Sequence, residues 1–198
     1  MGVPLFETER LLIRPFELSD LGVIHRLLDP DCDCQGGSRP HSGALALRDR
    51  WLRWTELSYD ELDRLHQPPY GDRAVVLKDS GAVIGAVGYA PSLKAFGQFP
   101  TWAGSAGPRR SLRAPEVGLF WSVVPEHRGR GYAAEAAQAL IDYAFQVMEV
   151  ARMVASADYS NASSLRVMEK LGMRIERNAF DEPPYLQAIG VLDNPAAP

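Results

Sequence analysis

The sequence predicts a mixed α/β fold in which one β-sheet is flanked by helices. The chain has 198 residues, which is enough for one domain with a full hydrophobic core. Its second half alternates short apolar runs with longer runs of helical periodicity, in the order strand, helix, strand, helix, strand, strand. Its first half holds two β-branched runs joined by a turn-rich link at residues 79–81. Strands and helices in this order are typical of a mixed sheet packed against helices.

The first 70 residues are predicted to form one strand and two helices. Residues 10–16 form the strand, which Pro15 closes, and Ser19 caps a short helix whose apolar residues have helical spacing. Residues 29–43 are rich in Asp, Cys, Gly, Ser and Pro, which is typical of a loop. A second helical region follows over about 44–57, continued by a short turn to Leu65, and it ends before Pro68 and Pro69. The apolar residues of the first helix are Leu21, Ile24, Leu27 and Leu28.

The middle of the chain predicts a hairpin followed by a long connection. Residues 73–78 and 83–89 are the two strands of the hairpin. Residues 92–114 show little periodicity, and a connection of that length inside a compact domain is often functional or mobile.

The second half supplies the rest of the sheet and the two helices expected to pack on it. Asn161 caps the second of these helices, whose apolar stripe is Leu165, Met168 and Leu171, and Gly172 ends it. The predicted strands cover 116–124, 152–157, about 173–180 and about 185–192, and the first helix covers 131–148.

Bulk composition excludes several classes of protein. The formal net charge is −4, so we expect no nucleic-acid partner through bulk electrostatics. We expect a cytoplasmic protein without a membrane partner, because no apolar run approaches the length of a membrane span and no signal peptide precedes the first strand. The two cysteines, Cys32 and Cys34, are separated by one residue and match no zinc-site spacing, so we expect free thiols and no bound metal.

Residues 125–133, Pro-Glu-His-Arg-Gly-Arg-Gly-Tyr-Ala, are the most informative segment. They form a basic turn between a predicted strand and a predicted helix, and a helix N-terminus offers unpaired N–H groups and a positive dipole end. Gly129 and Gly131 allow positive φ and close approach of a phosphate, while Arg128 and Arg130 add charge. The turn lacks the endings of a P-loop and of a dinucleotide fingerprint. Taken alone, it is either a phosphate site or simply a tight turn.

Three segments resemble one known family in its order and spacing. Residues 128–133 fit the Arg/Gln-x-x-Gly-x-Gly/Ala signature of the GNAT superfamily of acetyl-CoA-dependent N-acyltransferases. Residues 7–15 are similar to the first strand of its RimJ/RimL-like branch, the ribosomal-protein N-terminal acetyltransferases, and residues 161–173 are similar to that branch's Asn-x-x-Ser helix. The resemblance covers roughly 7–28 and 73–192. It implies one GNAT domain over 1–198 with a splayed central sheet, and acceptor-side insertions at about 30–70 and 92–114.

The resemblance also implies where acetyl-CoA is held as co-substrate. The diphosphate would lie on the backbone of the glycine turn, the thioester carbonyl would accept from a backbone N–H of the preceding strand, and Asn161 would contact the pantetheine or sulfur region. Alternatively, Asn161 acts only as the cap of its helix and does not contact the ligand. The implied binding residues are Trp121, Ser122, Val123, Arg128, Gly129, Arg130, Gly131, Tyr132, Ala133 and Asn161.

Two further side chains are candidates for proton transfer. Glu116, at the start of the central strand, is the candidate general base, with a strand-end salt bridge or acceptor contact as the alternative. Many GNAT enzymes carry a tyrosine acid where this chain has Met168, which cannot donate a proton. Ser164 matches the suspected donor of the RimJ/RimL-like branch, although its hydroxyl could instead satisfy the helix end. His127 is expected to be a solvated turn residue.

The sequence leaves the acceptor amine open. An α-amine has a pKa near 8 and is about one-tenth neutral at pH 7, whereas a lysine amine is neutral to well under about 0.1%. Within the branch that the chain resembles, the first expectation is a protein N-terminal α-amine. The alternatives are a small-molecule amine or antibiotic, or a domain that binds acyl-CoA without catalysis. A monomer and a homodimer are equally compatible with the sequence.

Overall fold

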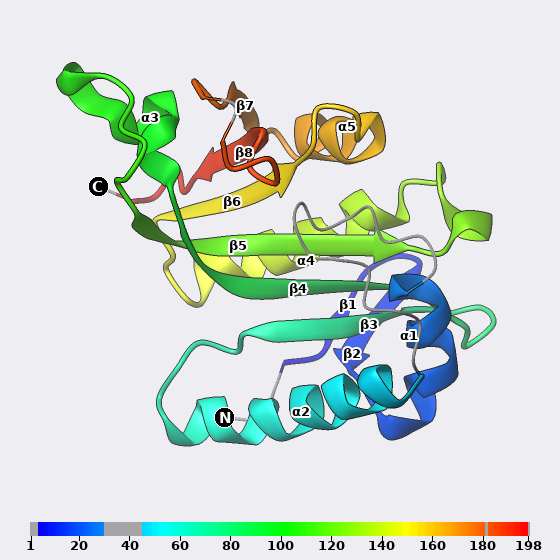
Figure 1. Ribbon diagram of the computed structural model, residues 1–198. Helices are drawn as coiled ribbons and strands as arrows, with labels where there is room; N and C mark the ends of the chain where they lie inside the picture. Colours follow the sequence, from blue (N-terminus) through cyan, green and yellow to red (C-terminus); the bar gives the residue numbers. More distant parts are fainter. Residues whose placement is uncertain (1–3, 30–44, 181, 198) are drawn as a thin grey trace.

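The computed structural model describes residues 4–29, 45–180 and 182–197 of the chain. It contains an eight-stranded, mostly antiparallel sheet with the strand order β1-β2-β3-β4-β5-β6-β8-β7 (Figure 1). The predicted mixed α/β sheet flanked by helices is therefore confirmed. The strands are β1 (Phe6–Glu7), β2 (Leu11–Pro15), β3 (Gly71–Leu77), β4 (Val83–Lys94), β5 (Ala114–Val123), β6 (Arg152–Ala157), β7 (Arg174–Arg177) and β8 (Ala188–Asp193).

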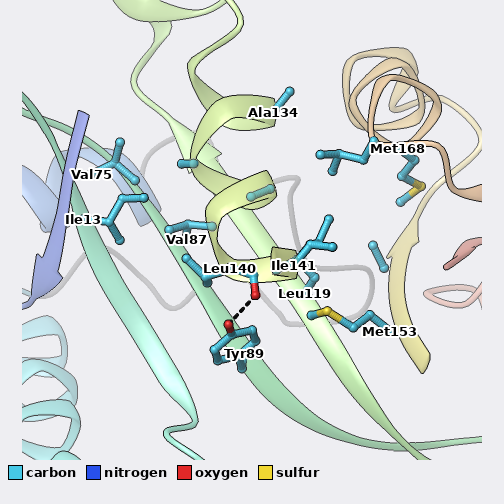
Figure 2. Close-up of a cluster of buried hydrophobic side chains, with 14 of the residues drawn as sticks. Ile13, Val75, Val87, Tyr89, Leu119, Ala134, Leu140, Ile141, Met153 and Met168 are labelled. Atoms are coloured by element: carbon cyan, nitrogen blue, oxygen red, sulfur yellow. Dashed lines mark hydrogen bonds between the residues drawn. The ribbon is translucent and has the colours of Figure 1, made fainter. Parts of the chain in front are cut away.

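One face of the sheet is covered by two helices of the second half, α4 (Tyr132–Gln146) and α5 (Ala162–Lys170). The largest buried cluster lies under them and joins the inward side of α4 to β2, β3, β4, β5 and β6 (Figure 2). The hydroxyl of Tyr89 on β4 donates to the carbonyl oxygen of Leu140 on α4 at 2.5 Å, which satisfies two buried polar groups at once. Small alanines at 134, 136, 137 and 144 let α4 lie close to the sheet.

The opposite face has two separate covers. Helices α1 (Leu21–Leu28) and α2 (Leu45–Arg64) pack on β2, β3 and β4 through a second cluster. The short elements η2 (Phe96–Gln98) and α3 (Pro100–Ala103) pack on β6 and β8 through a third cluster. Figure 1 shows β5 running between these two covers, with α1 and α2 on one side and α3 on the other.

Several sequence predictions differ from the structure in instructive ways. The segment 92–114 is not a loose connection, because β4 extends to Lys94 and the rings of Phe96 and Phe99 are buried against β6 and β8. Helix α2 runs without a break to Arg64, where the sequence predicted a helix to about 57 and a short turn to Leu65. Ser19 does not cap α1; it lies inside the 3-10 turn η1 (Leu18–Asp20), where Asp20 accepts from the backbone N–H of Glu17. The two final strands are shorter than predicted.

Other predictions lie outside the part of the chain that the structure describes. These are the loop at 30–43 and its cysteines, Cys32 and Cys34. Among the described residues, no helix is both long and apolar enough to cross a membrane, and no three His, Cys, Asp or Glu side chains are grouped so that they could hold a metal ion.

Candidate active site

The turn after β5 has the backbone geometry that phosphate binding requires. Gly129 has φ 76° and Gly131 has φ 85°, so both occupy the left-handed region, as predicted. Gly131 is the N-cap residue of α4, and no side chain caps that helix end. The first N–H groups of α4, including those of Tyr132 and Ala133, therefore point out of the helix without intrahelical partners. This is the arrangement that binds anions at helix N-termini.

Two basic side chains that the sequence did not indicate lie next to the glycine turn. A Cβ at Gly131 would lie 3.3 Å from Nζ of Lys170, at the end of α5, and 3.6 Å from Nη2 of Arg10, just before β2. Arg10 also donates to the carbonyl oxygen of Arg130 at 3.2 Å and is paired with Glu135 through a 2.7 Å hydrogen bond. Because Arg10 and Lys170 are distant from the turn in sequence, no local pattern could have indicated them.

The two predicted arginines of the turn have different environments. Both side chains are exposed. Nε of Arg128 donates to the carbonyl oxygen of Val123 at 2.8 Å, which fixes the turn against the end of β5. No such bond is made by the side chain of Arg130 to any described residue. Arg128 therefore shapes the turn, and Arg130 is the freer of the two charges.

The sheet opens between β5 and β6, immediately before this turn. The two strands are parallel and pair only at Val117–Met153 and Gly118–Val154, although both continue further. The N–H of Val124 bonds to the carbonyl oxygen of Ile84 at 2.9 Å, on the β4 side of the strand. N–H groups alternate in direction along a strand. That alternation points the N–H of Ser122 toward β4 and the N–H groups of Trp121 and Val123 into the opening.

Asn161 and Ser164 lie at the start of α5, which follows the carboxyl end of β6. Oδ1 of Asn161 accepts from the backbone N–H of Ser164 at 3.0 Å and from the hydroxyl of Ser163 at 2.8 Å, so Asn161 is the N-cap, as predicted. Its Nδ2 donates to none of the described residues and remains available to a ligand. Met168, further along α5, is fully buried in the core.

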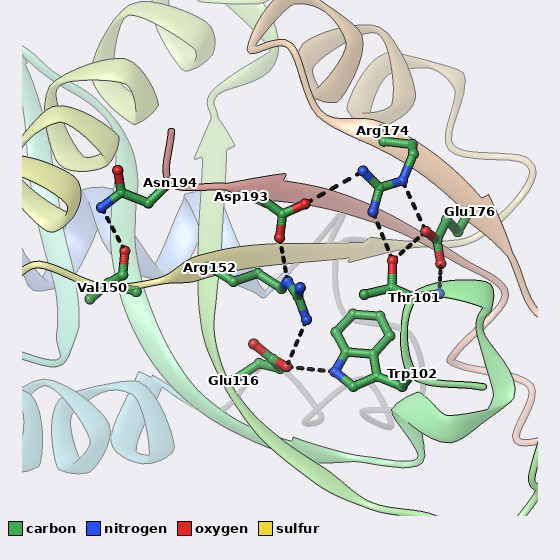
Figure 3. Close-up of polar contacts among 9 residues, drawn as sticks. All are labelled: Thr101, Trp102, Glu116, Val150, Arg152, Arg174, Glu176, Asp193 and Asn194. Atoms are coloured by element: carbon green, nitrogen blue, oxygen red, sulfur yellow. Dashed lines mark hydrogen bonds and ion pairs between the residues drawn. The ribbon is translucent and has the colours of Figure 1, made fainter. Parts of the chain in front are cut away.

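Glu116 is held near the start of β5 by two partners. Its Oε1 accepts from the indole Nε1 of Trp102 at 2.6 Å and lies 3.8 Å from Nη1 of Arg152 (Figure 3). Burial raises the pKa of Glu116, while the indole hydrogen bond and Arg152 oppose that rise. Glu116 and Arg152 line a cavity of about 800 Å³ together with Tyr70, Ser92 and Asp193. Trp102 was not predicted, since it lies in the segment 92–114, whose lack of periodicity predicted a connection.

The Glu116 site belongs to a longer ionic network (Figure 3). Arg152 donates to Asp193 at 2.6 Å, and Arg174 lies 3.5 Å from the other oxygen of Asp193. Arg174 also donates a hydrogen bond to the buried carboxylate of Glu176, and that carboxylate accepts a second hydrogen bond from the hydroxyl of Thr101 on α3. The salt-bridge alternative stated for Glu116 is thus present, and it leaves one carboxylate oxygen without a hydrogen bond from any described residue.

The candidate residues come from opposite ends of the β5–β6 pair. Glu116 lies near the amino end of β5, whereas the glycine turn and the start of α5 follow the carboxyl ends of β5 and β6 (Figure 1). The two residue pairs that join the strands, Val117–Met153 and Gly118–Val154, lie between Glu116 and the opening. The structure therefore brings the turn, the free N–H groups and Asn161 together at one end, and it places Glu116 at the other.

A second carboxylate, Asp72, was not predicted. It lies on β3 directly opposite Gly88 of β4, and a Cβ at Gly88 would lie 2.6 Å from its Oδ1. Burial raises the pKa of Asp72 to about 6, and the nearby charges of Arg73 and Arg48 only partly oppose the rise. Its carboxylate accepts no hydrogen bond from the described residues.

The comparisons with known proteins identify the family. The acetyltransferase (GNAT) domain matches residues 10–174, which is more than half of the chain. The chain belongs to the GNAT acetyltransferase family. This acetyltransferase is 28% identical over 169 residues to an uncharacterized N-acetyltransferase of Bacillus subtilis, YnaD, in a match covering 85% of this chain and 82% of YnaD. It is 26% identical over 171 residues to the uncharacterized N-acetyltransferase p20 of Bacillus licheniformis, covering 85% and 82% of the two chains.

Solved structures share the fold of this GNAT acetyltransferase. An acetyltransferase from Agrobacterium tumefaciens superposes with a TM-score of 0.67 at 24% identity, covering 97% of this chain and 95% of that one. A ribosomal-protein-S5-alanine acetyltransferase from Vibrio fischeri superposes with a TM-score of 0.65 at 19% identity, covering 98% and 99%. At these identities the likeness establishes the fold, which is the GNAT fold expected from the sequence.

Proposed function

We propose that this enzyme transfers the acetyl group of acetyl-CoA to a primary amine by direct attack in a ternary complex. The observation that carries the proposal is the opening between β5 and β6, which leads directly from the glycine turn. Its two unpaired N–H groups, on Trp121 and Val123, are backbone donors of the kind that stabilise a developing oxyanion. The turn and Lys170 supply the positive end that a diphosphate needs.

Two side chains are proposed to assist proton transfer. Glu116 is the candidate base, acting through a water in the cavity of about 800 Å³ that it lines. Burial raises the pKa of Glu116, which is the direction of change that makes a carboxylate a better general base. Ser164 is the candidate donor to the departing thiolate, because its hydroxyl lies in the first turn of α5 next to Asn161. Protonation of the thiolate should increase the rate of transfer only a little, because a thiol with a pKa near 8.5 is already a fair leaving group as its anion.

For the acceptor we propose an α-amine, with a protein N-terminus as the first candidate. About one-tenth of an α-amine is neutral at pH 7, so its deprotonation costs about 1.4 kcal/mol against more than about 4 kcal/mol for a lysine. The fold likeness to a ribosomal-protein acetyltransferase and the resemblance of residues 7–15 and 161–173 to the RimJ/RimL-like branch support this class. A small-molecule α-amine is the second candidate, because the cavity beside Glu116 is of a size that ordinary small-ligand sites have.

The donor site is tested by calorimetric titration of acetyl-CoA into the wild-type protein and the Gly131→Asp variant. An aspartate there should repel the diphosphate and also neutralise Lys170, so we expect binding to be lost. Gly81→Asp is the matched control: Gly81 has φ 69° and open space around it, so the backbone strain is similar and the site is the distant β3–β4 turn. Equal binding in all three folded proteins would refute the proposed donor site.

A further inference from the structure

Lys94 is the last residue of β4, at the point where that strand bends toward η2 and α3 (Figure 1). Its Nζ donates to the hydroxyl of Ser156 on β6 at 2.9 Å. Side chains alternate between faces along a strand, and Val154 packs in the cluster under α3. Ser156 and the ammonium of Lys94 therefore lie on the face opposite α4, the face on which β5 runs between the two covers.

This position is at the opening between β5 and β6. Pairing of the two strands stops at Gly118 and Val154, and Ser156 lies two residues further along β6. The hydroxyl that the ammonium binds therefore lies on the unpaired part of β6, while the backbone of Lys94 pairs with Ala114 at the start of β5.

The charge of Lys94 is not balanced by any described carboxylate. The side chain is half-buried, burial lowers its pKa, and its single hydrogen bond goes to a neutral hydroxyl. Two other partly buried cations are compensated, since Arg14 pairs with Asp20 and Arg48 pairs with Asp29, whereas the buried Arg73 donates to the backbone carbonyl oxygens of residues 69 and 71. A half-buried charge that is bonded only to a neutral hydroxyl is poorly compensated, so a ligand anion at this position would be favoured.

Acetyl-CoA does not supply that anion where it is needed. Its phosphates belong at the glycine turn, and the thioester end that reaches into the opening is uncharged. The anion must therefore come from the acceptor. We infer that Lys94 binds a carboxylate that the acceptor carries close to its reacting amine, so that the preferred acceptors are anionic near the α-amine. This inference rests on the proposed function.

Two sources of such a carboxylate are distinguished by paired acceptors. The first pair is a free amino acid and its amide. The second is a peptide with Asp at position two and the same peptide with Asn. CoA release is measured for each pair in wild type, Lys94→Met and Ser156→Ala. The ratio of kcat/KM within a pair is compared between proteins, because differences in amine basicity then cancel.

For at least one pair we expect the wild type to favour the carboxylate member by on the order of tenfold or more, the range of a hydrogen bond to a charged group. Lys94→Met should reduce that ratio to near one, while Ser156→Ala, which keeps the ammonium, should retain most of it. Which pair responds identifies the source of the carboxylate. Ratios that are unchanged by Lys94→Met would overturn the inference, as would stoichiometric acetylation of Lys94 itself in the intact mass.

Failure of the underlying function is separable from failure of this inference. Acetyl-CoA binding that is equal in wild type and Lys94→Met shows that the donor site and the fold are intact. If no acceptor turns over, an N-acetyl amino acid and its N-acetyl amide are titrated into the CoA-bound protein. Tighter binding of the acid, lost in Lys94→Met, supports the inference, and equal or undetectable binding of the two refutes it.

Discussion

Replacing Asp72 by Asn should stabilise the protein, and only above a defined pH. The two side chains have nearly the same shape, so the space beside Gly88 stays filled. The change removes a carboxylate whose charge is poorly solvated and accepts no hydrogen bond from the described residues. Burial raises its pKa to about 6 from the ordinary 3.8.

The sign and size follow from proton linkage. Between pH 3.8 and about 6 the folded state binds more protons at this site than the unfolded state, so stability falls as the pH rises through that window. A difference of about 2.2 pKa units corresponds to about 3 kcal/mol, fully expressed above about pH 6. Because the side chain is not completely buried, we expect a gain of about 1–3 kcal/mol for Asp72→Asn at pH 7.5 and almost none at pH 4.

Urea unfolding of wild type and Asp72→Asn at half-unit steps from pH 4 to pH 8 measures this difference directly. Asp79→Asn, in the exposed β3–β4 turn, is the matched control and should change stability by less than about 0.5 kcal/mol. A difference between wild type and Asp72→Asn that is constant with pH, or a destabilisation above pH 6, would refute the reasoning.

Five further substitutions have defined expected outcomes. Glu116→Gln should lower kcat/KM by about 10²–10⁴-fold and remove the acidic limb of the pH–rate profile, a result that a purely structural Glu116 would not give. Trp102→Phe removes the hydrogen bond that lowers the pKa of Glu116, so that limb should move to higher pH in steady-state assays. In denaturant titrations, Tyr89→Phe should destabilise by about 1 kcal/mol and Leu140→Ala by about 2–5 kcal/mol. Lys170→Met should weaken acetyl-CoA binding, and calorimetry should show a smaller loss in high salt; an unchanged affinity would remove Lys170 from the site.

Local patterns predicted those parts of the fold that local physics determines. The boundaries of β6 were predicted to the residue, because 152–157 is a short apolar run between turn residues. The positive φ at Gly129 and Gly131 followed from the need for a tight turn into α4. The cap at Asn161 followed from a side chain that commonly accepts from the helix end.

The structural features that the sequence did not indicate are those that depend on contacts between distant segments of the chain. Residues 96–103 lack helical or strand periodicity because Phe96 and Phe99 anchor them to β6 and β8 instead. Lys94, Arg10 and Lys170 reach the candidate site from strands and helices far from the glycine turn. The place where β5 and β6 separate cannot be recognised in either strand alone, since each has an ordinary strand sequence.

The short β5–β6 ladder has a consequence for the heat stability of the enzyme. Among the described residues, only two pairs join the strands β1–β5 to β6–β8 across the sheet, so α4 and the cluster beneath it provide most of the connection between the two halves. An acetyl-CoA molecule bound in the opening between β5 and β6 would form hydrogen bonds with both strands and would hold them together. Saturating acetyl-CoA should therefore raise the melting temperature and slow amide exchange at Trp121 and Val123 together, so that the resting enzyme is the more deformable form and the loaded enzyme the more rigid one.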